Sequence, residues 1–586
     1  MPRLTPRQRR EIIDRIESGE HLPDKYRFLL FADRRETELV WNGKSAEVCD
    51  LVLPFRTIER VDGRDAEKAA AGAGRDGAPC PGSHGRSGWI NKLIRGDNKL
   101  ILSSLKNGPL RAEIEGQGGL KLIYIDPPFD AGADVFADLE IGEGEAGGKP
   151  EAIRTIAYGD VWGRGEDSFI SMIYDRLVLM RDLLAEDGSI YAHCDWRFNS
   201  LMRLLLQEVF KNYNNEIIWH YTGGGRAGTY FSKKHDSIFW YAKGENWIFN
   251  PDAIRIPYKE TSGYAKCGIT SRGGRHYSPN PLGTLPDDVW DIPIVNPLSP
   301  ERSGYPTQKP EALLERIIKA SSREGDLVAD FFCGSGTTAA VAERLKRKWI
   351  AADMSKLAVH ATRKRLMGLR RDLAAGGESR PAFEVLVLEE CGANAGRTAR
   401  KAEKAMRCAT RKRAFPDFPL TARIEVAPLY SGERRVAVRL ENFTVVCAHS
   451  PVFLKNRSGI VLEHGQIVRI GKDRDGVVHR KPVTRKWTDW IDCWSIDFDF
   501  GRASDVVNRK NAEGGEIEEN GGDGFVFENM WRSFRTRKDR SLELTSVFHE
   551  YREGGRKRIA VRVTDVFGND HVSVIEVRAG ERTTNR

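Results

Sequence analysis

A carboxylate, two prolines and an aromatic ring follow directly on an apolar stretch of the chain. Residues 122–125 read Leu-Ile-Tyr-Ile, and Asp126, Pro127, Pro128 and Phe129 come next. The apolar run predicts a buried parallel strand, which must end at the prolines because proline has no N–H for a ladder. Ligands of open α/β sheets bind beyond the carboxyl ends of strands. An acid, a carbonyl and a ring there could hold a flat heterocycle and accept the protons of its exocyclic amine.

Taken alone, Asp126-Pro127-Pro128 is more simply an ordinary strand end with a proline turn. A second group of residues favours a binding site instead. Residues 327–330 predict a strand, which a glycine loop at 331–338 joins to a predicted helix at 339–345. The next strand, 349–352, ends at Asp353. The glycines let the backbone pass close to a ligand, and an acid in the position of Asp353 can bind two ribose hydroxyls. A glycine pair by itself is a weak signal.

The segments around these residues alternate between predicted helices and strands. Residues 168–184 carry apolar side chains at helical spacing, 189–195 form a predicted strand, and 199–210 predict another helix. This alternation predicts a layered α/β domain with a mostly parallel sheet. Residues 137–151, rich in Asp, Glu and Gly, are expected to form a flexible acidic loop beside the site.

Composition narrows the class of protein. A chain of 586 residues exceeds what one hydrophobic core supports, so roughly two to four domains are expected. The net charge of +9 is a weak sign of a polyanionic partner. None of the nine cysteines forms a CxxC pair, which argues for a reducing compartment and against a zinc site or a disulfide framework. The chain has no leader-like start or long apolar run, so we expect a soluble, cytoplasmic protein without a metal site.

With Thr307-Gln308-Lys309-Pro310 ahead of the glycine loop, the chain resembles the DNA amino-methyltransferases, which methylate adenine N6 or cytosine N4 with S-adenosylmethionine. Their DPP[YF] motif matches residues 126–129, and their FxGxG loop matches residues 332–336. The catalytic motif precedes the cofactor loop, as in the β group, and the overall plan is similar to type III modification subunits. The resemblance covers about residues 89–367.

The resemblance implies a Rossmann-like methyltransferase domain that acts on a base flipped out of duplex DNA. Asp126 and a proline carbonyl would accept hydrogen bonds from the target amine, and Phe129 would stack on the base. The catalytic motif would comprise Asp126, Pro127, Pro128 and Phe129. The cofactor S-adenosylmethionine would be bound by Asp97, Lys309, Asp330, Phe332, Gly334, Ser335, Gly336, Thr337 and Asp353. One departure is Phe331, which stands where the family usually has proline.

Residues 221–304 are loop-rich, and basic side chains alternate with aromatic ones. This composition suits phosphate contact and base stacking as well as an ordinary insertion. The resemblance implies that residues 221–304 are the target recognition region. Its candidate DNA-binding residues are Arg226, Lys233 and Lys234.

Changes in composition divide the chain into five expected parts. Residues 1–60 form an N-terminal α/β extension with an amphipathic helix at 5–18, and the Gly- and Ala-rich residues 61–88 form a flexible linker. The remaining parts are a methyltransferase domain at 89–390, a basic helical linker at 391–414 and a C-terminal all-β module at 415–586.

The resemblance leaves the target base and the partners open. Adenine N6 is expected, because cytosine-N4 specificity more often carries serine in place of Asp126. An RNA or protein-glutamine methyltransferase is disfavoured, since those relatives usually have the cofactor loop first. A non-catalytic DNA-binding subunit of a restriction or defence complex is disfavoured by the intact Asp126, Gly334 and Asp353. Double-stranded DNA is the expected partner, and family analogy suggests a homodimer and a restriction or defence subunit as further partners.

Overall fold

The computed structural model describes residues 5–18, 26, 39–41, 44, 49–62, 89–128, 135–143, 150–158, 166–222, 227–378, 380–389, 421–431, 434–446, 452–453, 460–463, 465–472, 477–501, 526–537 and 539–580. The chain divides into two compact units, Met1–Lys44 and Ser45–Arg586. In the first, α1 (Pro6–Glu17) forms where the sequence predicts a helix, because Thr5 and Gln8 cap its first turn reciprocally. None of the described helices is long and apolar enough to cross a membrane.

The second unit is built around one sheet of eleven strands. Its six central strands are parallel neighbours, in the order β6 (Leu184–Asp195), β3 (Leu120–Ile125), β12 (Leu327–Asp330), β13 (Lys348–Asp353), β2 (Asn91–Arg95) and β14 (Phe383–Leu388). Beyond β6 lie β8 (His235–Ala242), β7 (Asn212–His220) and β11 (Val289–Asp291), with β8 antiparallel to both of its neighbours. Beyond β14 lie β1 (Phe55–Val61) and β22 (Phe527–Asn529).

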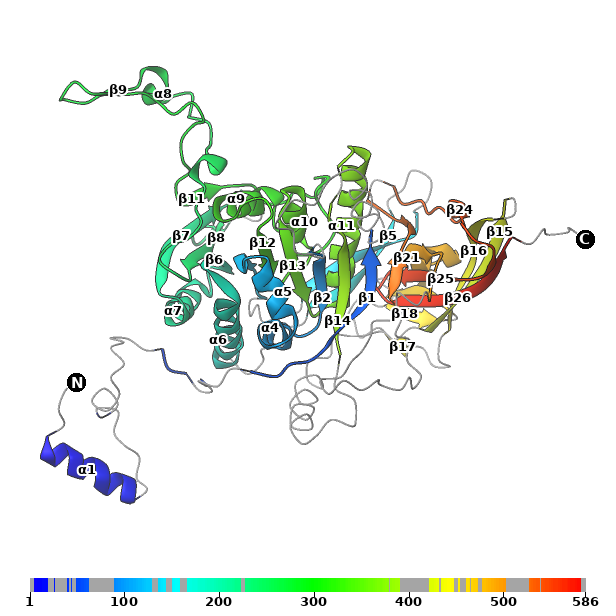
Figure 1. Cartoon of the computed structure of the whole chain (residues 1–586), viewed down its shortest axis with the longest axis horizontal. Helices are drawn as coiled ribbons and strands as arrows, with labels where there is room; N and C mark the ends of the chain where they lie inside the picture. Colours follow the sequence, from blue (N-terminus) through cyan, green and yellow to red (C-terminus); the bar gives the residue numbers. More distant parts are fainter. Residues whose placement is uncertain are drawn as a thin grey trace, which may run out of the picture. The chain divides into compact units, whose positions relative to one another are not determined.

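Helices cover both faces of this sheet (Figure 1). One layer comprises α4 (Asn98–Asn107), α5 (Leu110–Gly116), α6 (Glu166–Leu183) and α7 (Asn199–Val209). The other layer comprises α9 (Glu311–Ser321), α10 (Thr337–Arg344) and α11 (Lys356–Ala375). Helix α9 shows why the layers hold: Leu313, Leu314, Ile317 and Ile318 repeat at helical spacing and are fully buried.

The order of the strands creates a switch point between β3 and β12. From β3 the chain crosses through α6 to β6 on one side, whereas from β12 it crosses through α10 to β13 on the other. Crossovers that leave in opposite directions open a crevice at the carboxyl ends of the two strands, where α/β proteins bind ligands. The two sequence motifs therefore flank the same crevice.

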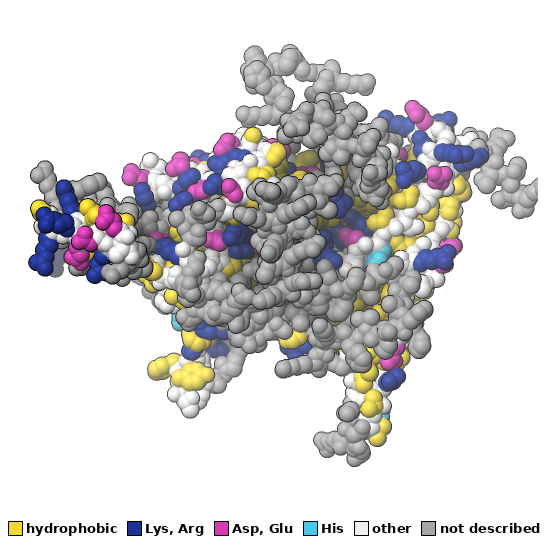
Figure 2. Space-filling model, turned by 90° about the horizontal axis from the view of Figure 1, so that it is seen from below, with side chains coloured by type: hydrophobic (Ala, Val, Ile, Leu, Met, Phe, Trp, Pro, Cys, Tyr) yellow, Lys and Arg dark blue, Asp and Glu magenta, His cyan; other side chains and the backbone are white. Residues whose placement is uncertain are grey.

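The C-terminal region consists of antiparallel sheets. They are β15 (Thr421–Tyr430), β16 (Arg435–Val446) and β24 (His549–Glu550); β17 (Val452–Phe453), β18 (Ile460–Glu463), β19 (Gln466–Lys472) and β20 (Val478–Pro482); and β23 (Trp531–Phe534), β21 (Ile491–Asp497), β25 (Gly555–Asp565) and β26 (Asp570–Ala579). The predicted fold class, a mostly parallel α/β domain with a C-terminal all-β module, is confirmed. On the face in Figure 2, the described basic and acidic side chains are interspersed.

The prediction of a flexible acidic loop at 137–151 is wrong for its described residues. Strands β4 (Val135–Ile141) and β5 (Glu151–Tyr158) form an antiparallel hairpin instead. Ile141 and Ile153 are buried in the core of the C-terminal module. The period-two pattern of apolar residues in β4 was masked by the surrounding acids and glycines, and its burial depends on a surface that lies far away in the sequence.

Buried ion pairs join the C-terminal module to the central sheet. Arg363 of α11 lies 3.1 Å from Glu59 of β1 and 3.1 Å from Asp570 of β26, and Arg562 of β25 also pairs with Glu59. Burial alone would raise the pKa of Glu59, but Arg562 and Arg363 hold it below its ordinary value. These contacts fix the module against α11.

The central sheet includes residues from several of the predicted parts of the chain. The limit at residue 60 falls inside β1, and the predicted recognition region 221–304 contributes β8 and β11 to the central sheet. Between them lie η2 (Pro251–Ile254), α8 (Gly263–Cys267), β9 (Ile269–Thr270) and β10 (His276–Tyr277). Linker residues 63–88 and the basic segment 391–414 lie outside the described residues, so the domain limits stay predictions.

Candidate functional site

Three carboxylates end three neighbouring strands at the switch point. Asp126 follows β3, Asp330 is the last residue of β12, and Asp353 is the last residue of β13. In the ladder Asp330 pairs with Tyr124 on one side and Ala351 on the other, so the strand ends are level. This edge therefore carries acids spaced by the width of a strand.

Asp126 is paired with Lys309. The Lys309 Nζ lies 2.6 Å from Asp126 Oδ2, and the two side chains are only 13% and 17% exposed. The other carboxylate oxygen, Oδ1, is buried and has no hydrogen-bond partner among the described residues. A buried acceptor without a donor is costly, so this oxygen is positioned for a donor that a ligand brings. Pro127 is buried beside it, whereas Phe129 lies outside the described residues.

Backbone strain is found close to Lys309. Thr307, two residues earlier, has a φ of 59° although it is β-branched. Such a residue rarely adopts left-handed backbone, and strained conformations gather at functional sites. The Lys309 carbonyl accepts a hydrogen bond from Thr337 Oγ1 at 3.3 Å, which ties this segment to the glycine loop.

The glycine loop fits so tightly that its glycines cannot be replaced without movement. Gly334 and Gly336 have φ values of 49° and 72°. A Cβ on Gly336 would lie 2.6 Å from the side chain of Thr362. The Gly334 N–H donates to Asp353 Oδ2 at 2.9 Å, and Thr362 Oγ1 donates to the Gly334 carbonyl at 3.0 Å. The loop backbone is therefore held in one path beneath the crevice.

The hydroxyl groups of the loop are also bonded. Ser335 Oγ lies 3.1 Å from Thr337 Oγ1, which accepts a hydrogen bond from Arg365 at 2.9 Å. Phe332 is half-buried, and its N–H donates to Asp330 Oδ1 at 3.0 Å. These bonds leave the first turn of α10 ordered at the edge of the site.

Burial sets the charge state of two of the acids. Asp330 is 3% exposed, and burial raises its pKa to about 7 although Thr338 donates to it at 2.5 Å. Burial also raises the pKa of Asp353, against the hydrogen bonds from Ser355 and Gly334. Asp330 is therefore poised to change its charge close to neutral pH.

Sequence reasoning missed Arg176, which holds the remaining acid of the site. Asp97 caps α4 by accepting the Lys99 N–H at 2.9 Å, and it pairs with Arg176 at 2.7 Å. Arg176 also donates to Asn98, whose amide donates to the Phe331 carbonyl at 2.8 Å. A charged residue on the apolar face of α6 was the available signal, because a buried cation needs a partner.

A second missed feature is a row of hydrogen bonds behind Asp126. Tyr124 Oη lies 2.8 Å from His193 Nδ1, and His193 Nε2 lies 3.1 Å from Asp236 Oδ2. Tyr221 donates to the other oxygen of Asp236 at 3.3 Å. Burial, followed by the charge of Asp126, raises the pKa of Tyr124, so its hydroxyl stays protonated. These contacts give His193 a structural role.

The predicted DNA-binding lysines lie at the same edge of the sheet. Strand β8 begins there, because its Asp236 pairs with Asp195 at the end of β6. The Lys233 Nζ lies 3.2 Å from the centre of the Trp196 ring, and Phe231 is 98% exposed. The Lys234 carbonyl accepts the Tyr221 N–H, whereas Arg226 lies outside the described residues.

The chain is similar in sequence to known DNA methyltransferases. A family model described as DNA methylase (N6_N4_Mtase) matches residues 120–364. The chain is 30% identical over 281 residues to "DNA adenine methyltransferase YhdJ" of Escherichia coli (strain K12), covering 48% of this chain and 81% of the relative. It is 36% identical over 203 residues to "Type II methyltransferase M1.MboII" of Moraxella bovis, covering 32% and 76%. Among solved structures, the M1.HpyAVI-SAM complex matches with 19% identity and a TM-score of 0.30, covering 47% of this chain and 98% of the other.

Proposed function

Because the chain belongs to the DNA methylase family, we propose that it is a site-specific DNA methyltransferase that transfers a methyl group from S-adenosylmethionine to adenine N6 of a flipped base in duplex DNA. The observation that carries this proposal is the buried Asp126 Oδ1, which has no hydrogen-bond donor among the described residues at the switch point of the sheet. An exocyclic amine brings the donor that this oxygen lacks.

The residues of the glycine loop fit S-adenosylmethionine. Gly334 and Gly336 adopt φ values of 49° and 72° that side chains rarely allow, so the loop backbone would approach the methionine part closely, and Asp330 would face its amino group. Asp353, with one oxygen on the Gly334 N–H and the other on the Ser355 N–H, retains lone pairs for ribose hydroxyls. Asp97, Phe332, Ser335 and Thr337 would complete the pocket. When bound, S-adenosylmethionine supplies a sulfonium methyl group that an in-line nucleophile can attack.

The catalytic motif would make the amine a better nucleophile. The lone pair of N6 is delocalised into the adenine ring, so the amine attacks weakly. Hydrogen bonds from its two N–H groups to Asp126 Oδ1 and to a proline carbonyl of 127–128 would bend the nitrogen and localise that pair. Lys309 would hold the carboxylate in place through Oδ2. Most of the catalysis would then be positioning and electrostatics, and the nitrogen would release one proton to water after transfer.

The duplex would be bound along the edge that carries Trp196, Phe231 and Lys233. A phosphate can replace the ring of Trp196 as the partner of the Lys233 ammonium, and Lys234 and Arg226 would add charge. The base must leave the stack to reach Asp126, and Phe129 would stack on it. An exposed ring such as Phe231 could take the place that the base vacates.

Two observations favour adenine as the target base. The motif begins with an aspartate, and the YhdJ relative is named as an adenine methyltransferase. Cytosine N4 is the alternative, because the amine chemistry is the same and the family model includes both specificities by name. A homodimer and a restriction or defence subunit are further proposals that rest on family analogy alone.

Nucleoside mass spectrometry of DNA from cells that express the wild type or Asp126→Ala tests the proposal. We expect N6-methyladenine with the wild type and with the control Asp372→Ala, whose carboxylate is exposed on α11, but none with Asp126→Ala. Calorimetry should show that Asp126→Ala still binds S-adenosylmethionine. Detection of N4-methylcytosine instead would show that the target base is cytosine, and the proposed mechanism of amine methylation would still apply. Unmodified DNA from cells with folded wild-type protein would refute the proposed function.

A further inference from the structure

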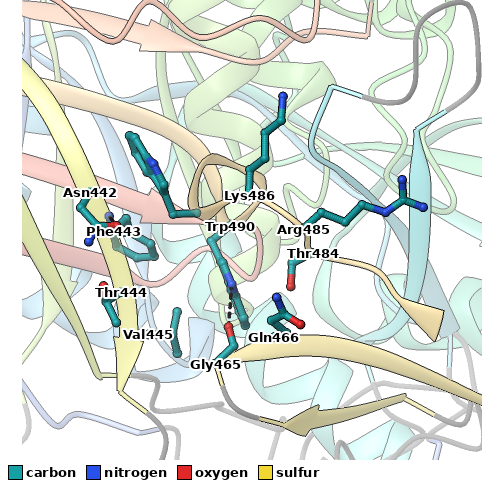
Figure 3. A pocket seen from close by; sticks show the side chains of 11 residues that line it. Asn442, Phe443, Thr444, Val445, Gly465, Gln466, Thr484, Arg485, Lys486 and Trp490 are labelled. Carbon is teal, nitrogen blue, oxygen red and sulfur yellow. Dashed lines mark hydrogen bonds between the residues drawn. The ribbon is translucent and has the colours of Figure 1, made fainter. Parts of the chain in front are cut away.

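A cavity of about 410 Å³ opens in the C-terminal module (Figure 3). Its wall is formed by the end of β16, the start of β19 and the segment 484–490, which includes η3 (Trp487–Trp490). Ligand pockets in proteins have volumes of about 300–1,000 Å³. The cavity is therefore large enough for a nucleotide-sized group.

Several polar groups that line this cavity have no partner within the described part of the chain. They are the hydroxyl of Thr444, the amide of Gln466 and the indole N–H of Trp487. Trp490 differs, because it is 3% exposed and its N–H donates to the Gly465 carbonyl at 3.0 Å. Trp490 thus belongs to the floor of the cavity, whereas Thr444 and Gln466 are exposed and Trp487 is half-buried, so their polar groups are accessible to a ligand that replaces water.

The three tryptophans of residues 487–494 differ in burial and in role. Trp494 and Trp490 are buried in the core of the module. Trp487 is only partly buried against that core, and it lines the cavity. A partly exposed indole in a cavity wall offers apolar surface on which a flat ring could stack.

The rim of the cavity is basic. Lys486 is exposed, and its ammonium forms no ion pair with any described residue. Arg485 extends away from Trp490 in Figure 3, and its charge lowers the pKa of Glu151 in β5, after the larger effect of Lys481. Arg480 and Lys481 on β20 are exposed too, but they pair with Glu463 at 3.4 Å and with Glu151 at 2.5 Å, so the contact to a phosphate rests on Lys486. The rim is complementary to a phosphate.

From these contacts we infer that the cavity binds one nucleotide of a DNA strand, as a second DNA contact besides the catalytic edge. The base stacks on Trp487, its hydrogen-bonding edge meets Thr444 and Gln466, and the phosphate lies against Lys486. The inference rests on the proposed function, since it takes DNA as the substrate of this chain.

The cavity adjoins the hairpin that follows the catalytic motif. Asp489 Oδ2 accepts the N–H groups of Arg485 and Lys486 at 2.8 and 2.9 Å. The same carboxylate lies against Gly142 at the end of β4, with no room for a Cβ there. DNA held in the cavity would therefore contact the same segment, 485–489, that holds the end of β4.

The test compares full-length wild type with Trp487→Ala and Lys486→Glu. Arg556→Glu is the control, because it reverses an exposed charge on the same module outside the cavity. DNA affinity is measured by fluorescence anisotropy with a labelled duplex and a labelled single strand at several salt concentrations. Methylation rates give KM and kcat, and calorimetry follows S-adenosylmethionine. We expect each cavity variant to raise the Kd for DNA about tenfold. Lys486→Glu should also reduce the salt dependence by about one phosphate contact.

The kcat at saturating DNA and the cofactor affinity should stay at the wild-type values in both variants. Cavity variants that bind DNA as tightly as Arg556→Glu, in a chain that methylates DNA, would overturn the inference and leave the proposed function intact. Wild-type protein that binds no DNA would overturn both. Unchanged DNA affinity together with a protein or peptide bound at Trp487 would assign the cavity to a different partner.

Discussion

Lys309 Nζ and Asp126 Oδ2 lie 2.6 Å apart although 183 positions separate the two residues in the sequence. This ion pair joins the loop after β3 to the segment before α9. It engages one oxygen of the carboxylate and leaves Oδ1 without a donor among the described residues. The pair therefore fixes the carboxylate while keeping one acceptor for the substrate.

Lys309→Ala should lower the rate of methyl transfer about 100-fold, because a carboxylate that turns away from the amine loses the attack geometry. Single-turnover methylation with saturating DNA measures the effect, and calorimetry checks that S-adenosylmethionine still binds. Lys319→Ala is the control, since it removes a lysine that pairs with Glu315 at a half-exposed site on α9. A rate equal to that of the control would show that Lys309 does not position Asp126.

The two motifs were predictable from the sequence because each is a local pattern. The prolines end β3 just before Asp126, and Gly336 is the N-cap of α10, so strand ends and loops could be placed from residues next to one another. The hairpin at β4 and β5 was not predictable in this way. Its burial depends on Trp490 and other residues that lie hundreds of positions later, and the pairing of Glu59 with Phe527 in the central sheet depends on the same kind of contact.

Within the site, roles that depend on a partner were the ones that sequence reasoning could not supply. Lys309 was predicted for the cofactor pocket, and the structure places its ammonium on Asp126. Arg176 was not singled out within the predicted helix 168–184, and it holds Asp97 and Asn98. Both contacts arise where separate strand ends meet, which a single segment does not reveal.

The affinity for S-adenosylmethionine should rise with pH up to about pH 7. The free protein binds a proton on Asp330, whose pKa is raised by burial to about 7. An ammonium group beside this carboxyl would favour the ionised form, so binding would release the proton, and affinity should fall up to tenfold per pH unit below 7. Above pH 7 it should level off.

Calorimetry at pH 6 and pH 8, in buffers with different ionisation enthalpies, measures both the affinity and the protons released. Asp330→Asn should bind more weakly at pH 8 and show no proton release. Equal affinity of the wild type for S-adenosylmethionine at the two pH values would show that Asp330 does not contact the cofactor's amino group.

Gly336→Ala should destabilise the fold and weaken cofactor binding. The added Cβ would meet Thr362 at 2.6 Å on a backbone with a φ of 72°, so we expect a loss of about 1–3 kcal/mol in the free energy of unfolding. Gly325→Ala is the matched control, because it has a φ of 84° with open space around the new Cβ. Urea unfolding and calorimetry compare the two variants. If both lose stability and cofactor affinity equally, backbone strain alone explains the effect, and the close approach to Thr362 is irrelevant.

Arg540 should matter to catalysis although it lies in the C-terminal module. Its guanidinium donates to the carbonyls of Glu140 and Gly142, each at 2.9 Å, and pairs with the Glu140 carboxylate at 3.2 Å. These contacts hold the end of β4, whose first residue, Val135, is seven positions after Pro128. The chain between them can span at most about 25 Å, so the catalytic motif is tethered at both ends.

Arg540→Ala should therefore lower kcat about tenfold with little change in the Kd for S-adenosylmethionine, because the motif loses positioning and keeps its cofactor loop. Hydrogen exchange of residues 135–143 should rise in the same variant, and Arg556→Ala should change neither quantity. Faster exchange with an unchanged kcat would mean that the hairpin only fastens the module to the fold. A fall in kcat without faster exchange would contradict this explanation, because Arg540 could then not act on the catalytic motif by holding β4.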